Sequence, residues 1–372
     1  MTRIDQAHLD IAAATHPGMI GKQNEDRYNV SAFLTGTEKN TPAVLAVLCD
    51  GIGGHRAGEV AAQMGVDLIA RGVAASDGQQ PIKTLEKAIQ KASHAIYKAS
   101  LSEQGCIGMG ATCACAWVIG NRLFTANLGD SRIYLLRGGH ILQLTTDHTW
   151  LQEAYDAGII DEEGADEHPN AHVIRRYLGS SKAPRPDFRL WFFEGESDAD
   201  ALDNQGLLLE PGDVLLLCSD GLTDLVTDEE IQALVISSPL SAVPAALIDL
   251  ANTRGGHDNT TVVLLGMPFG STEKSGASTR RRRLMGCLVG LIILVLLAAA
   301  VYVGLRWRAD RLDAQATTQP TITQPLPAQP TETPPAELTA TPPEVTHTPE
   351  VEEVVTTPLP TITPWPTHTP AP

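Results

Sequence analysis

The amino-acid sequence predicts an α+β fold in which helices cover antiparallel β-sheet. Turn residues at Gly120 and Asn121, and again at Gly138 and Gly139, separate short apolar runs. This spacing is typical of successive β-hairpins and therefore of antiparallel pairing. Segments with helical periodicity interrupt these runs in pairs, and hairpins interleaved with helix pairs indicate a layered α+β arrangement.

The elements are expected in a fixed order along the chain. Apolar or alternating runs predict strands at residues 8–15, 43–48, 111–119, 123–127, 133–136, 142–145, 213–218 and 260–265. Amphipathic spacing predicts helices at residues 57–75, 81–102, 228–235 and 241–253. Cys113 and Cys115 lie two apart in one predicted strand and face the same side, so they are interpreted as core thiols rather than metal ligands.

Composition divides the chain into four parts: a globular domain at 1–268, a basic linker at 269–283, an apolar segment at 284–305 and a Pro/Thr-rich tail at 306–372. The apolar segment has 22 residues without a charge. At about 1.5 Å per residue it spans roughly 33 Å, enough to cross a hydrocarbon core of about 30 Å. Flanking arginines at 280–283 and at 306 and 308, with Tyr302 and Trp307 at the interface, predict a transmembrane helix rather than a buried one.

The flanks also predict a topology. Five basic residues precede the span, three follow it, and the first 20 residues hold no secretory signal. We therefore expect a single-pass protein of the cell membrane, with a cytoplasmic globular domain and an extracytoplasmic tail. Residues 312–372 contain 15 of the 25 prolines and 16 threonines, which predicts a disordered, extended spacer. A formal charge of −17 argues against nucleic-acid binding, and six scattered cysteines suit a reducing compartment.

Acidic residues stand at the ends of the predicted strands. They are Glu25 and Asp26 after the first strand, Asp50 after 43–48, Asp130 before 133–136, Asp220 after 213–218 and Asp258 before 260–265. A single aspartate in a turn is commonly only a cap. Several carboxylates at one sheet edge, however, would repel one another unless cations sat between them.

The residue types indicate a hard divalent cation. All-oxygen ligands favour Mg²⁺ or Mn²⁺ over zinc, and two such ions can activate water and stabilise charge on a phosphoryl group. The sequence has neither a Gly-x-Ser-x-Gly elbow nor a Walker A loop. Hydrolysis by a metal-bound water is therefore the expected chemistry.

Several motifs occur in an order known from one family. They are Asn24-Glu25-Asp26, Asp50-Gly51-Ile52-Gly53-Gly54-His55, Gly108-Met109-Gly110-Ala111-Thr112, Gly129-Asp130-Ser131-Arg132, Asp147-His148-Thr149, residues 173–179, Ser219-Asp220-Gly221-Leu222 and Asp258-Asn259. Over residues 8–267 the chain resembles bacterial-type members of the metal-dependent type 2C protein serine/threonine phosphatases. The resemblance implies two stacked antiparallel sheets flanked by helices (an α-β-β-α sandwich), with a flap within residues 147–179 beside the active site.

The resemblance also implies site roles. Asp50 would bridge two Mn²⁺ or Mg²⁺ ions, the Gly51 carbonyl would bind one of them, and Asp220 and Asp258 would complete the other shell. Glu25 and Asp26 would hold metal-bound waters, and Asp130 with Asp220 would form a third, weaker site. These roles make Asp50, Asp220 and Asp258 the expected catalytic residues.

Two positions depart from the family pattern. Gly21 stands where a phosphate-binding arginine is usual, and the neighbouring Lys22 is the candidate substrate-binding residue. Lysine binds phosphate as a point charge, without the fork geometry of arginine. Ile52 stands where animal members carry a histidine that acts as general acid, and His55 follows three residues later. His55 is either an acid for the leaving oxygen or a residue with a structural or phosphate-orienting role.

The sequence thus predicts a membrane-anchored phosphatase of phosphoserine and phosphothreonine in proteins. Its expected partners are phosphorylated proteins, including the serine/threonine kinases that it would oppose. Two alternatives remain open. One is a weakly active phosphoprotein-binding scaffold, and the other is an enzyme of the same fold that hydrolyses small phosphate esters.

Overall fold

The computed structural model describes residues 1–36, 40–53, 57–102, 106–160, 168–193 and 195–269. These residues belong to one compact unit, Met1–Gly276. No helix among them is long and apolar enough to cross a membrane. The predicted span at 284–305, the basic linker from residue 270 onward and the tail lie outside the described residues, as does His55.

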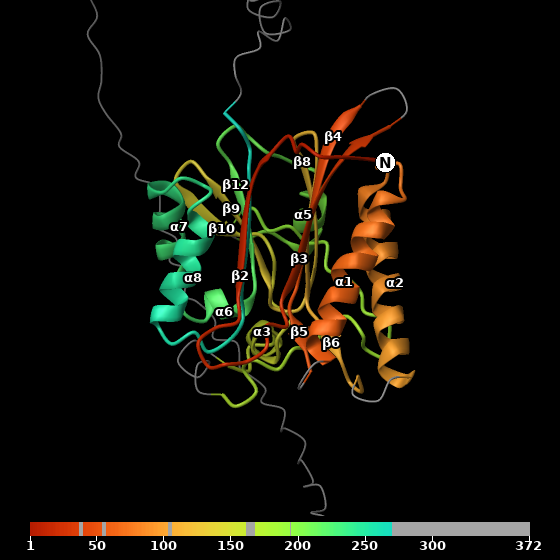
Figure 1. The fold of residues 1–372 in the computed structure, drawn as a ribbon, viewed down its shortest axis with the longest axis vertical. Coiled ribbons are helices and arrows are strands. Elements are labelled where there is room, and N and C mark those ends of the chain that lie inside the picture. Colours follow the sequence, from red (N-terminus) through yellow and green to blue (C-terminus); the bar gives the residue numbers. More distant parts are fainter. Residues whose placement is uncertain (37–39, 54–56, 103–105, 161–167, 194, 270–372) are drawn as a thin grey trace, which may run out of the picture. The chain divides into compact units, whose positions relative to one another are not determined.

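Among the described residues, two antiparallel sheets form the centre of the domain (Figure 1). The first contains, in spatial order, β1 (Thr2–Ile4), β3 (Arg27–Thr35), β4 (Thr41–Cys49), β7 (Cys113–Ile119), β8 (Arg122–Leu128) and β11 (Leu207–Leu208). The second contains β10 (His140–Gln143), β9 (Arg132–Arg137), β12 (Val214–Cys218), β13 (Thr260–Gly266) and β2 (Asp10–His16). A short ladder joins β5 (Gly51–Ile52) to β6 (Gly110–Ala111).

Helices cover the outer face of each sheet. On the first sheet lie α1 (Ala57–Ala74) and α2 (Pro81–Ser102), and on the second lie α7 (Asp228–Ser237) and α8 (Val243–Thr253), so that Figure 1 shows helix pairs on opposite sides of the sheets. Within the described ranges, three short helices lie in connections: α3 (Trp150–Asp156), α5 (Asp198–Asp203) and α6 (Asp220–Thr223). The predicted α+β arrangement, its hairpins and its four long helices are confirmed.

The apolar runs of the central strands are explained by burial on both faces. In β4, Leu45 and Val47 pack toward α1 and α2, whereas Val44 and Leu48 pack between the two sheets. In β13, Val263 packs between the sheets and its neighbours pack toward α7 and α8. A strand that is buried on both faces has a continuous apolar sequence, and this is why these strands could be predicted from the sequence.

The pairing register of the strands places the acidic residues at one end of both sheets. Arg27 pairs with Cys49, which places Asp26 beside Asp50. In the second sheet Cys218 pairs with both Arg132 and Val262. Asp220, Asp130 and Asp258 therefore emerge together at the matching ends of neighbouring strands. Antiparallel pairing thus gathers residues that lie far apart in the sequence.

Candidate active site

The turn after β4 brings main chain close to the base of α1. A Cβ atom on Gly51 would lie 2.4 Å from the carbonyl carbon and oxygen of Gly58, so only glycine fits at this position. Thr112 fixes the neighbouring aspartate from two sides: its Oγ1 accepts the Asp50 N–H at 2.8 Å, and its own N–H donates to the Asp50 carbonyl at 2.8 Å. The main chain of Asp50 is therefore held at the end of the first sheet, next to the close approach at Gly51.

Asp26 lies behind this turn and is 1% exposed. The Ser219 hydroxyl donates to its Oδ2 at 2.7 Å, while its Oδ1 is buried without a hydrogen-bond partner among the described residues. The neighbouring Glu25 is held through its main chain, because its N–H donates to Oδ1 of Asn259 at 2.7 Å. Asn259 in turn follows Asp258, so the acidic motif of the N-terminal segment is tied directly to that of β13.

Asp130 stands in the turn between β8 and β9. Gly129 precedes it with φ +99°, and a Cβ there would lie 2.6 Å from Cγ2 of Thr112, so the turn requires glycine. Ser131 follows it, and its hydroxyl lies 2.7 Å from Oγ1 of Thr112. Oδ1 of Asp130 is buried and has no hydrogen-bond partner in the described part of the chain.

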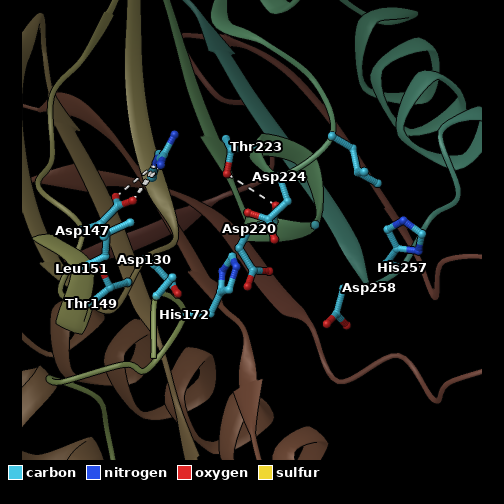
Figure 2. Close-up of a pocket in the computed structure, with 14 residues that line it drawn as sticks. Asp130, Asp147, Thr149, Leu151, His172, Asp220, Thr223, Asp224, His257 and Asp258 are labelled. Carbon is cyan, nitrogen blue, oxygen red and sulfur yellow. Dashed lines mark hydrogen bonds and ion pairs between the residues drawn. The ribbon is translucent and has the colours of Figure 1, made fainter. Parts of the chain in front are cut away.

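Two adjoining cavities collect these side chains. One, of about 480 Å³, is lined by Lys22, Gln23, Glu25, Asp50, Gly51, Ile52, Gly53, Ile174, Asp220, Asp258 and Asn259. The other, of about 500 Å³, includes Asp130, His172, Asp220, Asp224 and Asp258 in its lining. Figure 2 shows these five side chains directed toward a common hollow. Asp220 and Asp258 border both cavities and join them into one acidic site.

Lys22 contributes a positive charge to the lining of the first cavity. Its Nζ lies 3.1 Å from Oδ2 of Asp258, and about half of each side chain is exposed. The neighbouring Gly21 has φ +74° with open space around its Cβ position. The structure therefore places the candidate phosphate-binding lysine beside the predicted ligand Asp258.

The site strongly favours protonation or cation binding. Burial, followed by the charges of Asp26, Asp220 and Asp130, raises the pKa of Asp50 well above its ordinary value. Burial and the charges of Asp130, Asp224 and Asp26 do the same for Asp220. Burial is also the main reason that the pKa of Asp26 and that of Asp130 rise to about 6. Clustered carboxylates of this kind are stabilised by cations between them.

The donor set fits hard divalent cations. The predicted side-chain ligands Asp50, Asp220 and Asp258 offer only carboxylate oxygens, and Asp26, Asp130 and Asp220 each have one buried oxygen without a hydrogen-bond partner among the described residues. As the side chains stand, no three histidine, cysteine, aspartate or glutamate residues of the described ranges are grouped so that they could hold an ion. The carboxylates would therefore have to draw together around a cation that they shared.

The sequence singled out the acidic residues but not the groups that hold them. Ser219, Thr112, Ser131 and Asn259 are buried and hydrogen-bonded to the site. Each lies within or directly beside a recognised motif, and that adjacency was the available signal. Cys113 and Cys115 are buried in the core with their Sγ atoms 3.4 Å apart, as expected of core thiols.

The chain is similar to several known proteins. The family profile described as "Protein phosphatase 2C" matches residues 20–154. "Serine/threonine phosphatase stp" of Listeria monocytogenes is 36% identical over 256 residues, which cover 68% of this chain and 93% of that protein. "Protein phosphatase PhpP" of Streptococcus pneumoniae is 33% identical over 266 residues, which cover 70% of this chain and 98% of that protein.

The chain is also similar to a solved structure of a serine/threonine phosphatase. A crystal structure of the catalytic domain of serine threonine protein phosphatase PstP in complex with 2 manganese ions has 33% sequence identity and a TM-score of 0.56. It covers 69% of this chain and 97% of that one. Each of these similarities extends over nearly the whole of the other protein.

Proposed function

The chain belongs to the protein phosphatase 2C family and is a serine/threonine phosphatase of that type, a metal-dependent hydrolase; from this premise we propose that its acidic site hydrolyses phosphoserine and phosphothreonine in proteins with two divalent cations. The observation that supports the proposal is the convergence of Asp50, Asp220 and Asp258 on one cavity.

The proposed ligands are Asp50, the Gly51 carbonyl, Asp220 and Asp258. Glu25 and Asp26 would lie in the surrounding shell, and Asp130 would hold a third ion together with Asp220. Mn²⁺ and Mg²⁺ both suit these oxygen donors. When bound, such ions would lower the pKa of water and stabilise negative charge on a phosphoryl group.

The chain's own residues prepare this site. Thr112 and Ser219 hold Asp50 and Asp26 in place by hydrogen bonds, so little rearrangement of the main chain is needed. A cation at Asp258 would compete with Lys22 for that carboxylate. The released ammonium group would then be free to contact the phosphate of the substrate.

The substrate class and the cellular setting complete the proposal. Phosphorylated proteins, including serine/threonine kinases, are the proposed partners, by analogy with the family. Residues 284–305 are proposed to anchor the enzyme in the membrane, because they form an uncharged segment of 22 residues between arginine-rich flanks. The catalytic domain would then face the cytoplasm.

The test is hydrolysis of a phosphothreonine peptide and of p-nitrophenyl phosphate by the full chain, with and without Mn²⁺. We expect turnover that depends on Mn²⁺ and falls by at least about 100-fold in Asp50→Asn and in Asp220→Asn, because each removes a carboxylate from the ion-binding set. Phosphopeptide binding without Mn²⁺-dependent turnover would instead support the scaffold. A higher kcat/KM for small esters than for phosphopeptides would favour the second alternative, an enzyme that hydrolyses small phosphate esters.

A further inference from the structure

His148 is a buried residue that the proposed chemistry does not use. It is 4% exposed and stands at the start of the predicted flap region (residues 147–179), hydrogen-bonded to the turn that carries Asp130. Its two ring nitrogens and its main chain contact three different parts of the molecule. These contacts are unusual for a residue whose role is only to fill space, since each ring nitrogen has its own polar partner.

The Nδ1 side of the ring holds the Asp130 turn. Nδ1 accepts the N–H of Gly129 at 3.1 Å, and the His148 N–H donates to the Gly129 carbonyl at 2.9 Å. Gly129 directly precedes Asp130, so this pair of hydrogen bonds sets where the Asp130 carboxylate lies. The Asp130 side chain itself accepts no such bond at its buried Oδ1 among the described residues.

The Nε2 side is fixed by a buried anion. Because Nδ1 accepts a hydrogen bond, the ring proton lies on Nε2, which donates to Oδ2 of Asp187 at 3.2 Å. Asp187 exchanges two main-chain hydrogen bonds of 2.9 Å with Asn127 and is also bound by the guanidinium of Arg189. Burial works to raise the pKa of Asp187, but the hydrogen bonds from His148 and Arg189 outweigh it and lower the pKa.

The main chain of His148 continues into the flap. Its carbonyl accepts the N–H of Arg175 at 2.7 Å, and the next residue, Thr149, forms a β-bridge with Ile174. The Trp150 N–H then donates to the Val173 carbonyl at 2.8 Å. These bonds close the base of the flap, so one residue is hydrogen-bonded both to the flap and to the Asp130 turn.

We propose that His148, oriented by Asp187, is a positioning residue that couples the base of the flap to Asp130 and thereby sets how tightly the Asp130 site binds its cation. The inference rests on the proposed function, since it assumes that Asp130 binds an ion. His148 itself contacts neither ion nor substrate. It acts through the Gly129 N–H, whose position determines that of the carboxylate that follows.

Two substitutions of His148 test the contributions of its two ring nitrogens separately. His148→Asn keeps an acceptor near the Nδ1 position and loses the link to Asp187, whereas His148→Gln keeps a donor near Nε2 and loses the link to Gly129. The measurement is calorimetric titration of the chelator-treated full chain with Mn²⁺, together with the melting temperature. We expect His148→Gln to raise the dissociation constant of the weakest-bound ion by about tenfold, the range found for partners of metal ligands. His148→Asn should change it less than about threefold.

Asp187→Asn provides a second measurement if the Gln variant does not fold, because it keeps the shape of the acceptor but removes its charge. Like His148→Asn, it affects only the link to Asp187, so it should change the dissociation constant of the same ion by less than about threefold; a change of about tenfold would contradict the assignment of the effect to the Gly129 hydrogen bond. Equal losses of Mn²⁺ affinity in the Asn and Gln variants, in step with the melting temperature, would mean that His148 is merely structural and would overturn the inference. Wild-type protein that bound no Mn²⁺ would overturn the proposed function, and this inference with it.

Discussion

Asp26 and Asp130 make the stability of the metal-free protein depend on pH in an unusual direction. The pKa of each rises in the folded state from 3.8 to about 6, so the folded protein holds these protons more tightly than the unfolded chain does. Their stabilising contribution is therefore complete below pH 3.8 and is lost as the pH rises through about 6. At 1.36 kcal/mol per pKa unit, the loss is on the order of 3 kcal/mol for each group.

We therefore expect the melting temperature of chelator-treated protein to fall between pH 5 and pH 7.5, and Mn²⁺ to restore more of it at pH 7.5 than at pH 5. Differential scanning calorimetry at several pH values measures both effects. The control is Asp26→Asn, which should flatten the fall in part, because it removes one of the buried carboxyl groups whose pKa is raised. A melting temperature that rose steadily over this range without metal would contradict the argument.

Lys22 is expected to contribute to substrate binding rather than to turnover. Lys22→Ala should raise KM for a phosphothreonine peptide by about tenfold or more and leave kcat within about threefold, because a hydrogen bond to a charged group is worth about 1.5–3 kcal/mol. Steady-state kinetics with Mn²⁺ measures this. Lys83→Ala, an exposed lysine on α2, is the control and should change neither constant.

The neighbouring Gly21 shows a limit of prediction from the sequence at the scale of single residues. The family pattern suggests arginine at position 21, but Gly21 has φ +74°, a conformation that strains any side chain. Lys22→Arg is therefore the better way to add fork geometry, and it should lower KM relative to wild type. An unchanged KM in both Lys22 variants would mean that another group binds the phosphate. Backbone conformation of this kind cannot be read from residue types alone.

At the scale of elements, the packing of β5 against α1 depends on small residues. A Cβ on Gly58 would lie 2.8 Å from both the Glu25 carboxylate and the Gly51 carbonyl. Gly58→Ala should therefore displace two predicted ion-binding groups and lower kcat at least about tenfold, in addition to a loss of about 1–3 kcal/mol in stability.

The matched control lies on the same helix. A Cβ on Gly72 would lie 2.8 Å from Cβ of Ala88, on the contact between α1 and α2 and away from the site. Gly72→Ala should cost similar stability in urea unfolding but keep the kcat of the folded enzyme. If both variants lost activity in proportion to stability, the close approach at Gly58 would have no special part in catalysis.

The sequence predicted elements according to how strongly their burial marks them. Strands with two buried faces and the four long helices were predicted to within a few residues. In contrast, β3 (Arg27–Thr35) was missed, because the polar Asn29 and Ser31 interrupt its apolar pattern and bond to each other instead. The two-residue strands β5, β6 and β11 are too short to leave a pattern. The helix α3 was hidden within the flap region, where only its N-cap, Thr149, marks it.

At the scale of the whole molecule, the catalytic part and the segments after it should be separable. The described residues belong to the compact unit Met1–Gly276, and the apolar segment begins at residue 284. We expect residues 1–276 to be soluble and to keep the kcat of the full chain, and the full chain to remain in the membrane fraction after a high-salt wash. Membrane fractionation of both proteins measures their solubility, and steady-state kinetics of both measures kcat. A full chain released by salt alone would argue against the span.

The convergence of the acidic residues could not be obtained from local patterns. Thr260 pairs with His16 across most of the domain, and no periodicity in either segment specifies its partner. The resemblance to a known family supplied that long-range order, whereas the residues alone indicated only that the carboxylates end apolar strands. Strand pairing over such separations depends on the whole hydrophobic core.

The position of β13 inside the second sheet, between β12 and β2, also has a consequence for biosynthesis. During translation β2 is synthesised early, but it cannot pair with β13 until nearly the entire domain has been synthesised. Asp258 and β13 arrive last, so an incomplete nascent chain lacks both a finished sheet and a full set of acidic groups. A chain truncated before β13 would therefore lack both the strand between β12 and β2 and the Asp258 carboxylate, and we expect it to have no phosphatase activity.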